Sequence, residues 1–236
     1  MKQRIKGVPN GGGKADRSAF LSRIPDITGV ILAGGESRRM KSDKSLLPLG
    51  GARFIDHVYR VVDELFEEVL IVTNSPNGYA DIPCRKVTDL HVNRGVLAGI
   101  HSGLCHSRHA RVFVVACDMP FINPLVVRAI CTSSVAADVV IPSQTVGLEP
   151  LHAIYAKSCI KAITDQLDAG EKRITSFFLK VCVRELGSEY WQGVDPQGLS
   201  FCNINTPNEY FRLRCEAEDQ KFVQEGQQAC SGDRLP

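Results

Sequence analysis

The chain has 236 residues, 44% of them hydrophobic, which is enough to build one sizeable core. Lysine and arginine (28 residues) nearly balance aspartate and glutamate (26), so the sequence gives no support for a nucleic-acid-binding surface, and any attraction for anions must be local. Nine cysteines without a C-x-x-C pair indicate reduced thiols in the core of a cytoplasmic protein. No apolar run approaches the roughly 18–20 residues of a membrane span.

The two ends of the chain differ in composition from the middle. Residues 1–25 contain three consecutive glycines and almost no periodic apolar residues, and residues 215–236 are charged and rich in glutamine. We therefore expect a flexible extension at each end. Residues 26–214 are expected to form a single domain with two halves, 26–122 and 123–214.

The first element inside the domain is the apolar run 27–32, which leads into Gly34 and Gly35 and then into a cationic segment. Paired glycines let backbone N–H groups face an anion, so this order predicts a buried strand that ends in a phosphate-binding loop. The spacing fits neither a dinucleotide fingerprint nor a Walker loop, in which Asp43 would have to be glycine. The alternative is an ordinary strand-to-helix turn with solvated basic residues.

Apolar periodicity then predicts helices alternating with strands. In chain order, the expected elements are a helix over 54–66, strands over 67–74 and 82–89, a helix from 93, a strand over 111–118, a helix over 125–131, strands over 138–142 and 151–155, helices over 156–167 and after 173, and a strand over 202–207 that leads into a last helix. This alternation indicates an α/β fold with three layers, α/β/α, around a mostly parallel, Rossmann-like central sheet.

Polar residues follow several of the expected strands. Asn74 and Asp118 stand at the carboxyl ends of strands, where parallel sheets bind ligands, and glycines open the helix after residue 93. A carboxylate facing a basic loop suits Mg²⁺ in triphosphate chemistry. The alternative is that Asp118 caps the helix that follows. His101, His106 and His109 are near Cys105, but no acidic partner stands at the usual spacing, so we do not expect a zinc site.

The segment 32–44, LAGGESRRMKSDK, resembles the signature L-A-G-G-x-S-x-R-M-G-x-x-K of the molybdenum cofactor guanylyltransferases. More broadly, it resembles nucleotidyltransferases with a sugar-nucleotide-transferase-like (GT-A-like) fold. Lys41 stands where the signature has its last glycine. The resemblance covers about residues 27–213, with further matches at Asn74, Asp89, 97–99, 117–120 and 203–207.

This resemblance implies a reaction. The terminal phosphate of Mo-molybdopterin attacks the α-phosphorus of GTP, with Mg²⁺ as the cofactor and pyrophosphate as the leaving group. A phosphate has its second pKa near about 6, so this nucleophile is ionised at neutral pH and needs no general base. Molybdenum-insertion proteins and apo-molybdoenzymes are further implied partners, whereas nucleic acids and membranes are not.

The resemblance also implies the residues of the site. Backbone groups after the first strand, cations of the loop and polar residues at strand ends would bind GTP in the half 26–122: Leu32, Ala33, Gly34, Gly35, Arg38, Arg39, Lys44, Asn74, Asp89 and Asp118. Of these, Arg38, Lys44 and Asp118 are expected to be catalytic, and Asp118 is expected to bind the metal. The acceptor is expected on the half 123–214, at Glu149, Pro150, Lys172, Arg173, Asn203 and Asn205.

Some alternatives remain open for these residues and for the activity. The alternative for the segment around Glu149 and Pro150 is a plain hairpin connection, and the alternative for Lys172 and Arg173 is a solvated helix entry. An alternative activity for the same fold is that of a cytidylyltransferase or a sugar-phosphate nucleotidyltransferase. Glycine rather than alanine at position 35 favours a purine by leaving room for it, a difference worth about 1–3 kcal/mol. A non-catalytic homologue would bind GTP and release no pyrophosphate.

Overall fold

The computed structural model describes residues 22–33, 45, 48–49, 52–133, 136–204, 208–209 and 211–212. With η for 3₁₀-helices, the elements in chain order are β1 (Ile24–Leu32), β2 (Pro48–Leu49), β3 (Ala52–Arg53), α1 (Phe54–Leu65), β4 (Phe66–Val72), η2 (Pro76–Tyr79), β5 (Arg85–Val87), α2 (Val96–His106), β6 (Arg111–Ala116), α3 (Pro124–Thr132), β7 (Val139–Gln144), β8 (Gly147–Leu148), β9 (His152–Ala156), α4 (Cys159–Asp168), η3 (Ile174–Lys180), β10 (Val183–Leu186), η4 (Ser188–Tyr190) and η5 (Leu199–Phe201).

One large sheet runs through the molecule in the strand order β10-β7-β9-β6-β1-β4-β5, with β8 paired to β7. β1 pairs in parallel with both β4 and β6, β5 pairs in parallel with β4, and β10 with β7. β9 is antiparallel to both of its neighbours, β6 and β7. The predicted α/β class with a mostly parallel sheet is therefore confirmed.

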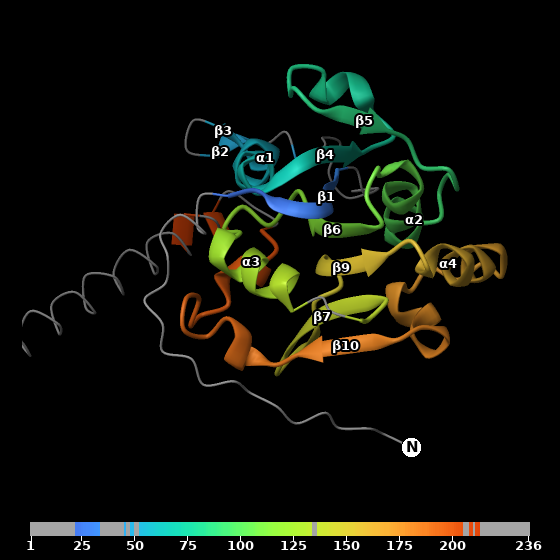
Figure 1. Cartoon of the computed structure of the whole chain (residues 1–236). Helices are drawn as coiled ribbons and strands as arrows, with labels where there is room; N and C mark the ends of the chain where they lie inside the picture. Colours follow the sequence, from blue (N-terminus) through green and yellow to red (C-terminus); the bar gives the residue numbers. More distant parts are fainter. Residues whose placement is uncertain are drawn as a thin grey trace, which may run out of the picture.

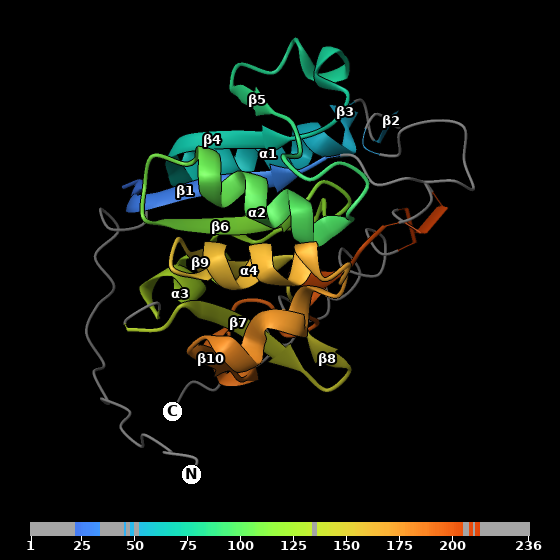
Figure 2. The same ribbon diagram turned by 90° about the vertical axis from the view of Figure 1, so that its right-hand side faces the viewer.

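Helices cover both faces of this sheet, which gives the three predicted layers (Figure 1). α1 and α3 pack on one face, and α2 and α4 lie side by side on the other (Figure 2). β1 shows why both faces need cover: Val30 faces one core and Ile31 the other, and both are fully buried. None of the helices in the described ranges is long and apolar enough to cross a membrane.

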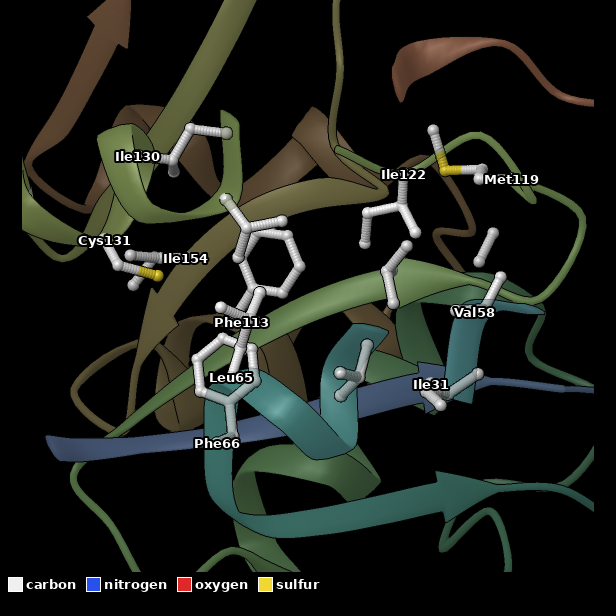
Figure 3. Packing of buried hydrophobic residues seen from close by; sticks show 14 of the residues in the cluster. Ile31, Val58, Leu65, Phe66, Phe113, Met119, Ile122, Ile130, Cys131 and Ile154 are labelled. Atoms are coloured by element: carbon white, nitrogen blue, oxygen red, sulfur yellow. The ribbon is translucent and has the colours of Figure 1, made fainter. Parts of the chain in front are cut away.

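The core beneath α1 and α3 illustrates how the sequence pattern becomes packing. α1 buries Phe54, Ile55, Val58, Val62 and Leu65, the face that the apolar spacing predicts. In its first turn, the carboxylate of Asp56 accepts hydrogen bonds from the backbone amide of Arg53 (2.8 Å) and from the Arg53 guanidinium. Figure 3 shows this core from close by, with Val58 and Leu65 of α1 near Phe66 and Phe113. The rings of Phe66 and Phe113 are stacked, and their centroids lie 5.7 Å apart.

Three sequence expectations need correction. The strand expected from residue 202 is wrong for 202–204, where the amide of Ile204 bonds the carbonyl of Asp118 (2.8 Å) instead of a neighbouring strand. Thr206 and Pro207 lie outside the described residues. β10 was not expected, because only two of its four residues are apolar. The helix expected after residue 173 is the 3₁₀-helix η3 and not an α-helix.

At Gly29, β1 packs closely against Val62 of α1 and Phe66 of β4. A Cβ atom at this position would lie 2.4 Å from Cγ1 of Val62 and 2.8 Å from Cδ2 of Phe66. Both neighbours are fully buried, so neither can move aside without disturbing the core.

We therefore expect Gly29→Ala to lower the free energy of unfolding by about 3 kcal/mol, through overpacking. Gly193→Ala is the matched control, because a Cβ there would meet nothing within 4 Å. We expect that change to stay within about 0.5 kcal/mol of the wild type. Urea unfolding of the two variants measures both effects, and equal stabilities would contradict this packing.

His152 is an unusual core residue. It is fully buried, its ring centroid lies 5.1 Å from that of Phe113 and 5.0 Å from that of Phe201, and among the described residues neither ring nitrogen has a hydrogen-bond partner. Burial lowers its pKa to about 3, because the apolar surroundings penalise the charged imidazolium.

This residue should make stability depend on pH. An unfolded histidine has a pKa of about 6.5, so between pH 6.5 and 3 the unfolded chain binds more protons and is favoured as the pH falls. As the pH falls through this window, we expect the free energy of unfolding of the wild type to drop by up to roughly 1.4 kcal/mol per pH unit relative to that of His152→Leu. Above pH 7, the difference in free energy between the two proteins should be constant. Urea unfolding across pH tests this, and a difference that stayed constant down to pH 4 would contradict it.

Candidate functional site

A cavity of about 360 Å³ opens where the parallel strands end. Leu32 is the last residue of β1, Val72 the last of β4 and Ala116 the last of β6, and all three line the cavity. The parallel register explains their meeting, because Leu32 is paired with Val72 on one side and with Ala116 on the other. The residues that follow these strands therefore leave the sheet together, as the site of an α/β fold requires.

The amino-terminal end of α2 forms a second wall. Gly95 and Val96 line the cavity, and Gly95 has φ +72°, a conformation that favours glycine. One turn later, a Cβ on Gly99 would lie 3.3 Å from Leu32 and 3.8 Å from Oδ1 of Asp89, so glycine keeps this wall close to both. The positive end of the helix dipole thus faces the cavity, an arrangement that attracts anions.

Asn74 and Asp89 form a reciprocal pair in the cavity. The side-chain amide of Asn74 donates to Oδ2 of Asp89 (3.0 Å), and the backbone amide of Asp89 donates to Oδ1 of Asn74 (3.2 Å). The other carboxylate oxygen, Oδ1 of Asp89, is buried and has no hydrogen-bond partner among the described residues. Burial raises the pKa of Asp89, and the bond from Asn74 partly opposes this shift.

Asp118 follows β6 and lines the cavity together with Asn203. The hydrogen bond from the amide of Ile204 to the Asp118 carbonyl (2.8 Å) ties the two segments to each other, although Asn203 comes 85 positions after Asp118 in the chain. The predicted carboxylate and the predicted acceptor-side amide are therefore neighbours in one cavity.

The half 123–214 contributes Leu151, Lys172 and Asn203 to the cavity. The loop that carries Lys172 meets the loop before α2: a Cβ on Gly95 would lie 4.0 Å from Cβ of Lys172. Residues from both halves thus form one continuous wall, and Lys172 brings a positive charge to it.

Other predicted residues lie beside the cavity and do not line it. Ala33 is buried and its amide donates to the carbonyl of Val72 at 2.9 Å. Glu149 accepts a hydrogen bond from Gln144, and the Pro150 carbonyl accepts one from Tyr155 (2.7 Å). Arg173 precedes η3. The remaining predictions lie outside the described residues: Gly34, Gly35, Arg38, Arg39, Lys44 and Asn205.

Several cavity residues had no predicted role in the site, among them Leu151 and Asn93. Leu151 was expected only as part of a strand, and Asn93 only as part of a helix start. The glycines near residue 93 are the signal that could have identified Asn93, because they bring the helix start close to the sheet. For Leu151 the sequence holds no such signal.

Comparison with known proteins agrees with this geometry. Residues 29–184 match the family described as MobA-like NTP transferase domain. A probable molybdenum cofactor guanylyltransferase from Pelotomaculum thermopropionicum is 39% identical over 194 residues, covering 82% of this chain and 95% of the relative. A molybdenum cofactor guanylyltransferase from Desulfosudis oleivorans is 38% identical over 185 residues, covering 78% and 92%.

A solved structure leads to the same family. The crystal structure of molybdopterin-guanine dinucleotide biosynthesis protein A from Archaeoglobus fulgidus superposes with a TM-score of 0.71 and 26% identity, covering 81% of this chain and 99% of that one. The fold and the cavity thus define an α/β nucleotidyltransferase. The chain belongs to the MobA-like NTP transferase family.

The Asn74–Asp89 pair can be tested without any ligand. Asn74→Ala removes a bond that stabilises the ionised carboxylate, so we expect the pKa of Asp89 to rise further. Asn77→Ala, which changes an exposed amide in η2, is the control and should leave that pKa unchanged. Carbon-13 NMR titration of the Asp89 carboxyl group measures both, and an unchanged or lower pKa in Asn74→Ala would show that the pair does not form in solution.

Proposed function

We propose that this protein transfers GMP from GTP to the terminal phosphate of molybdopterin, which forms molybdopterin guanine dinucleotide and releases pyrophosphate. Two relatives that are 38–39% identical to this chain are named molybdenum cofactor guanylyltransferases, one of them as probable. The alignments span 92–95% of their length. The observation within this chain that supports it best is the buried, unpartnered Oδ1 of Asp89 in a cavity at the carboxyl edge of the sheet.

Asp89 suits guanine because of its hydrogen-bonding pattern. A carboxylate only accepts hydrogen bonds, and guanine presents two neighbouring donors, N1–H and the 2-amino group. Cytosine and adenine present an amino donor next to an acceptor nitrogen, which a carboxylate would repel. With Asn74 holding Oδ2, the carboxylate is fixed in place with Oδ1 left for the base.

Asp118 suits Mg²⁺. This ion is usually held by one or two protein carboxylates together with substrate phosphates, rather than by a full protein cage. The described part of the chain has no group of three or more acidic, histidine or cysteine residues arranged for a metal, and Asp118 lines the cavity beside the side-chain amide of Asn203. When bound there, Mg²⁺ would neutralise charge on the triphosphate.

The protein's own part in the reaction is alignment and charge neutralisation. Lys172 reaches the cavity and would contact phosphate. For Arg38, Arg39 and Lys44 this role rests on the sequence alone, as does the role of Asn205 in binding the acceptor. Asn203, Arg173 and Pro150 belong to the half that would bind molybdopterin, whose phosphate must reach the α-phosphorus of GTP next to Asp118.

The direct test is pyrophosphate release by the purified protein with Mg²⁺ and molybdopterin, measured in parallel with GTP, CTP, ATP and UTP. We expect release with GTP only. Release with CTP would keep the chemistry but overturn the role of Asp89. If GTP bound and no nucleotide gave pyrophosphate, the protein would be a nucleotide-binding homologue without transferase activity.

The metal assignment has its own test. We expect Asp118→Ala to reduce the rate of pyrophosphate release about 100-fold or more, while the protein remains folded. Asp165→Asn removes an exposed carboxylate on α4, outside the cavity, and should retain the wild-type rate. In EDTA, the wild type should fall to the residual rate of Asp118→Ala. A wild-type rate in Asp118→Ala would show that another group carries the metal.

A further inference from the structure

A second partly buried carboxylate, Glu149, lies at the same edge of the sheet as the cavity. β7 and β6 are both antiparallel to β9, so they run in the same direction and end at the same edge. Glu149 follows the β7–β8 hairpin at that edge, and its amide donates to the carbonyl of Pro142 (2.9 Å). It therefore belongs to the half of the protein that would bind the acceptor.

The surroundings of Glu149 connect it to the cavity. Leu151, two residues later, lines the cavity, and so does Asn203. Burial raises the pKa of the Cys202 thiol, adjacent to Asn203, and the charges of Asp195 and Glu149 add to this effect. Glu149 thus lies at the sheet edge that holds the cavity, on the side away from the β4 and β5 ends, which carry Asn74 and Asp89.

Glu149 is held in the same way as Asp89. The side-chain amide of Gln144 donates to Oε1 of Glu149 (2.6 Å), just as Asn74 donates to Oδ2 of Asp89 (3.0 Å). Gly198 lies next to Gln144, and a Cβ added to this glycine would be 3.0 Å from Oε1 of Gln144. In both pairs a carboxamide fixes one oxygen of a partly buried carboxylate, and burial raises the pKa of both acids.

The two substrates of the proposed reaction present the same pair of adjacent hydrogen-bond donors. Guanine and a pterin each contain a 2-amino-4-oxo-pyrimidine ring, in which an amino group and a ring N–H are adjacent donors. A carboxylate accepts both bonds, and charge-assisted bonds of this kind are among the strongest in proteins. We propose that Glu149 binds the 2-amino group and N3–H of the pterin of molybdopterin, as the acceptor-side counterpart of Asp89 on guanine. This inference rests on the proposed function.

Glu149→Gln is the variant of choice. Its amide oxygen can still accept from Gln144, but its NH₂ group would then face the donors of the pterin. We expect KM for molybdopterin to rise about 10- to 100-fold, with KM for GTP unchanged. Glu185→Gln, which removes an exposed carboxylate on β10, is the matched control and should leave both constants unchanged. An unchanged KM for molybdopterin in Glu149→Gln would overturn the proposal.

Binding can also be measured without turnover. With the guanine site filled by α,β-methylene-GTP, whose bridge cannot be cleaved, fluorescence titration compares 6-hydroxymethylpterin with its 2-oxo analogue, which lacks the amino group. We expect the wild type to prefer the pterin at least about 10-fold, and Glu149→Gln to lose this preference. Equal preference in the two proteins would overturn the role of Glu149 even if GMP transfer occurs. A preference that depends on Glu149 would support it even if GMP transfer fails.

Discussion

The structure depends on the position of β1 between two parallel partners. Its backbone is hydrogen-bonded to β4 on one side and β6 on the other, and its side chains are buried on both faces. Such a strand can only be built if helices cover both faces of the sheet, which leaves the strand ends as the places where polar groups can meet water and ligands. Because the three strands are in register, their carboxyl ends form one edge, and the cavity lies there.

A carboxylate in this setting is unfavourable before a ligand arrives. Burial penalises the ionised form of Asp89, and one bond from Asn74 offsets only part of that penalty. A ligand that donates to Oδ1 recovers the missing hydrogen bond, whereas a ligand that presents an acceptor makes the penalty larger. The selectivity of such a site therefore arises from the hydrogen bond that it leaves unsatisfied.

Much of this architecture could be predicted from the sequence. The continuous apolar run of β6 and the spacing of apolar residues in α1 identified both elements, and Asp118 was expected at a strand end because the run stops there. The antiparallel direction of β9 could not be predicted, since a short apolar strand carries no signal for the direction of its partners. The segment 202–204 does not form the predicted strand, because the amide of Ile204 donates to the carbonyl of Asp118 instead of to a neighbouring strand. That contact depends on tertiary structure, which the sequence pattern does not reveal.

The site was predictable to a smaller extent. Asn74 and Asp89 were expected to hold the nucleoside, but their mutual hydrogen bonds follow from the approach of the β4 and β5 ends. Likewise, Leu151 reaches the cavity only because β9 starts at the shared edge. The resemblance to a known family suggested these residues, and the three-dimensional arrangement adds that Oδ1 of Asp89 has no hydrogen-bond partner among the described residues.

The central claim is that Asp89 recognises the donor pair of guanine, and calorimetry with inosine triphosphate tests it most directly. This nucleotide keeps N1–H and lacks only the 2-amino group of GTP. If the carboxylate accepts both bonds, the wild type should bind GTP about 10-fold or more tightly than inosine triphosphate, and Asp89→Asn should lose this difference. Equal affinity of the wild type for the two nucleotides would contradict the account.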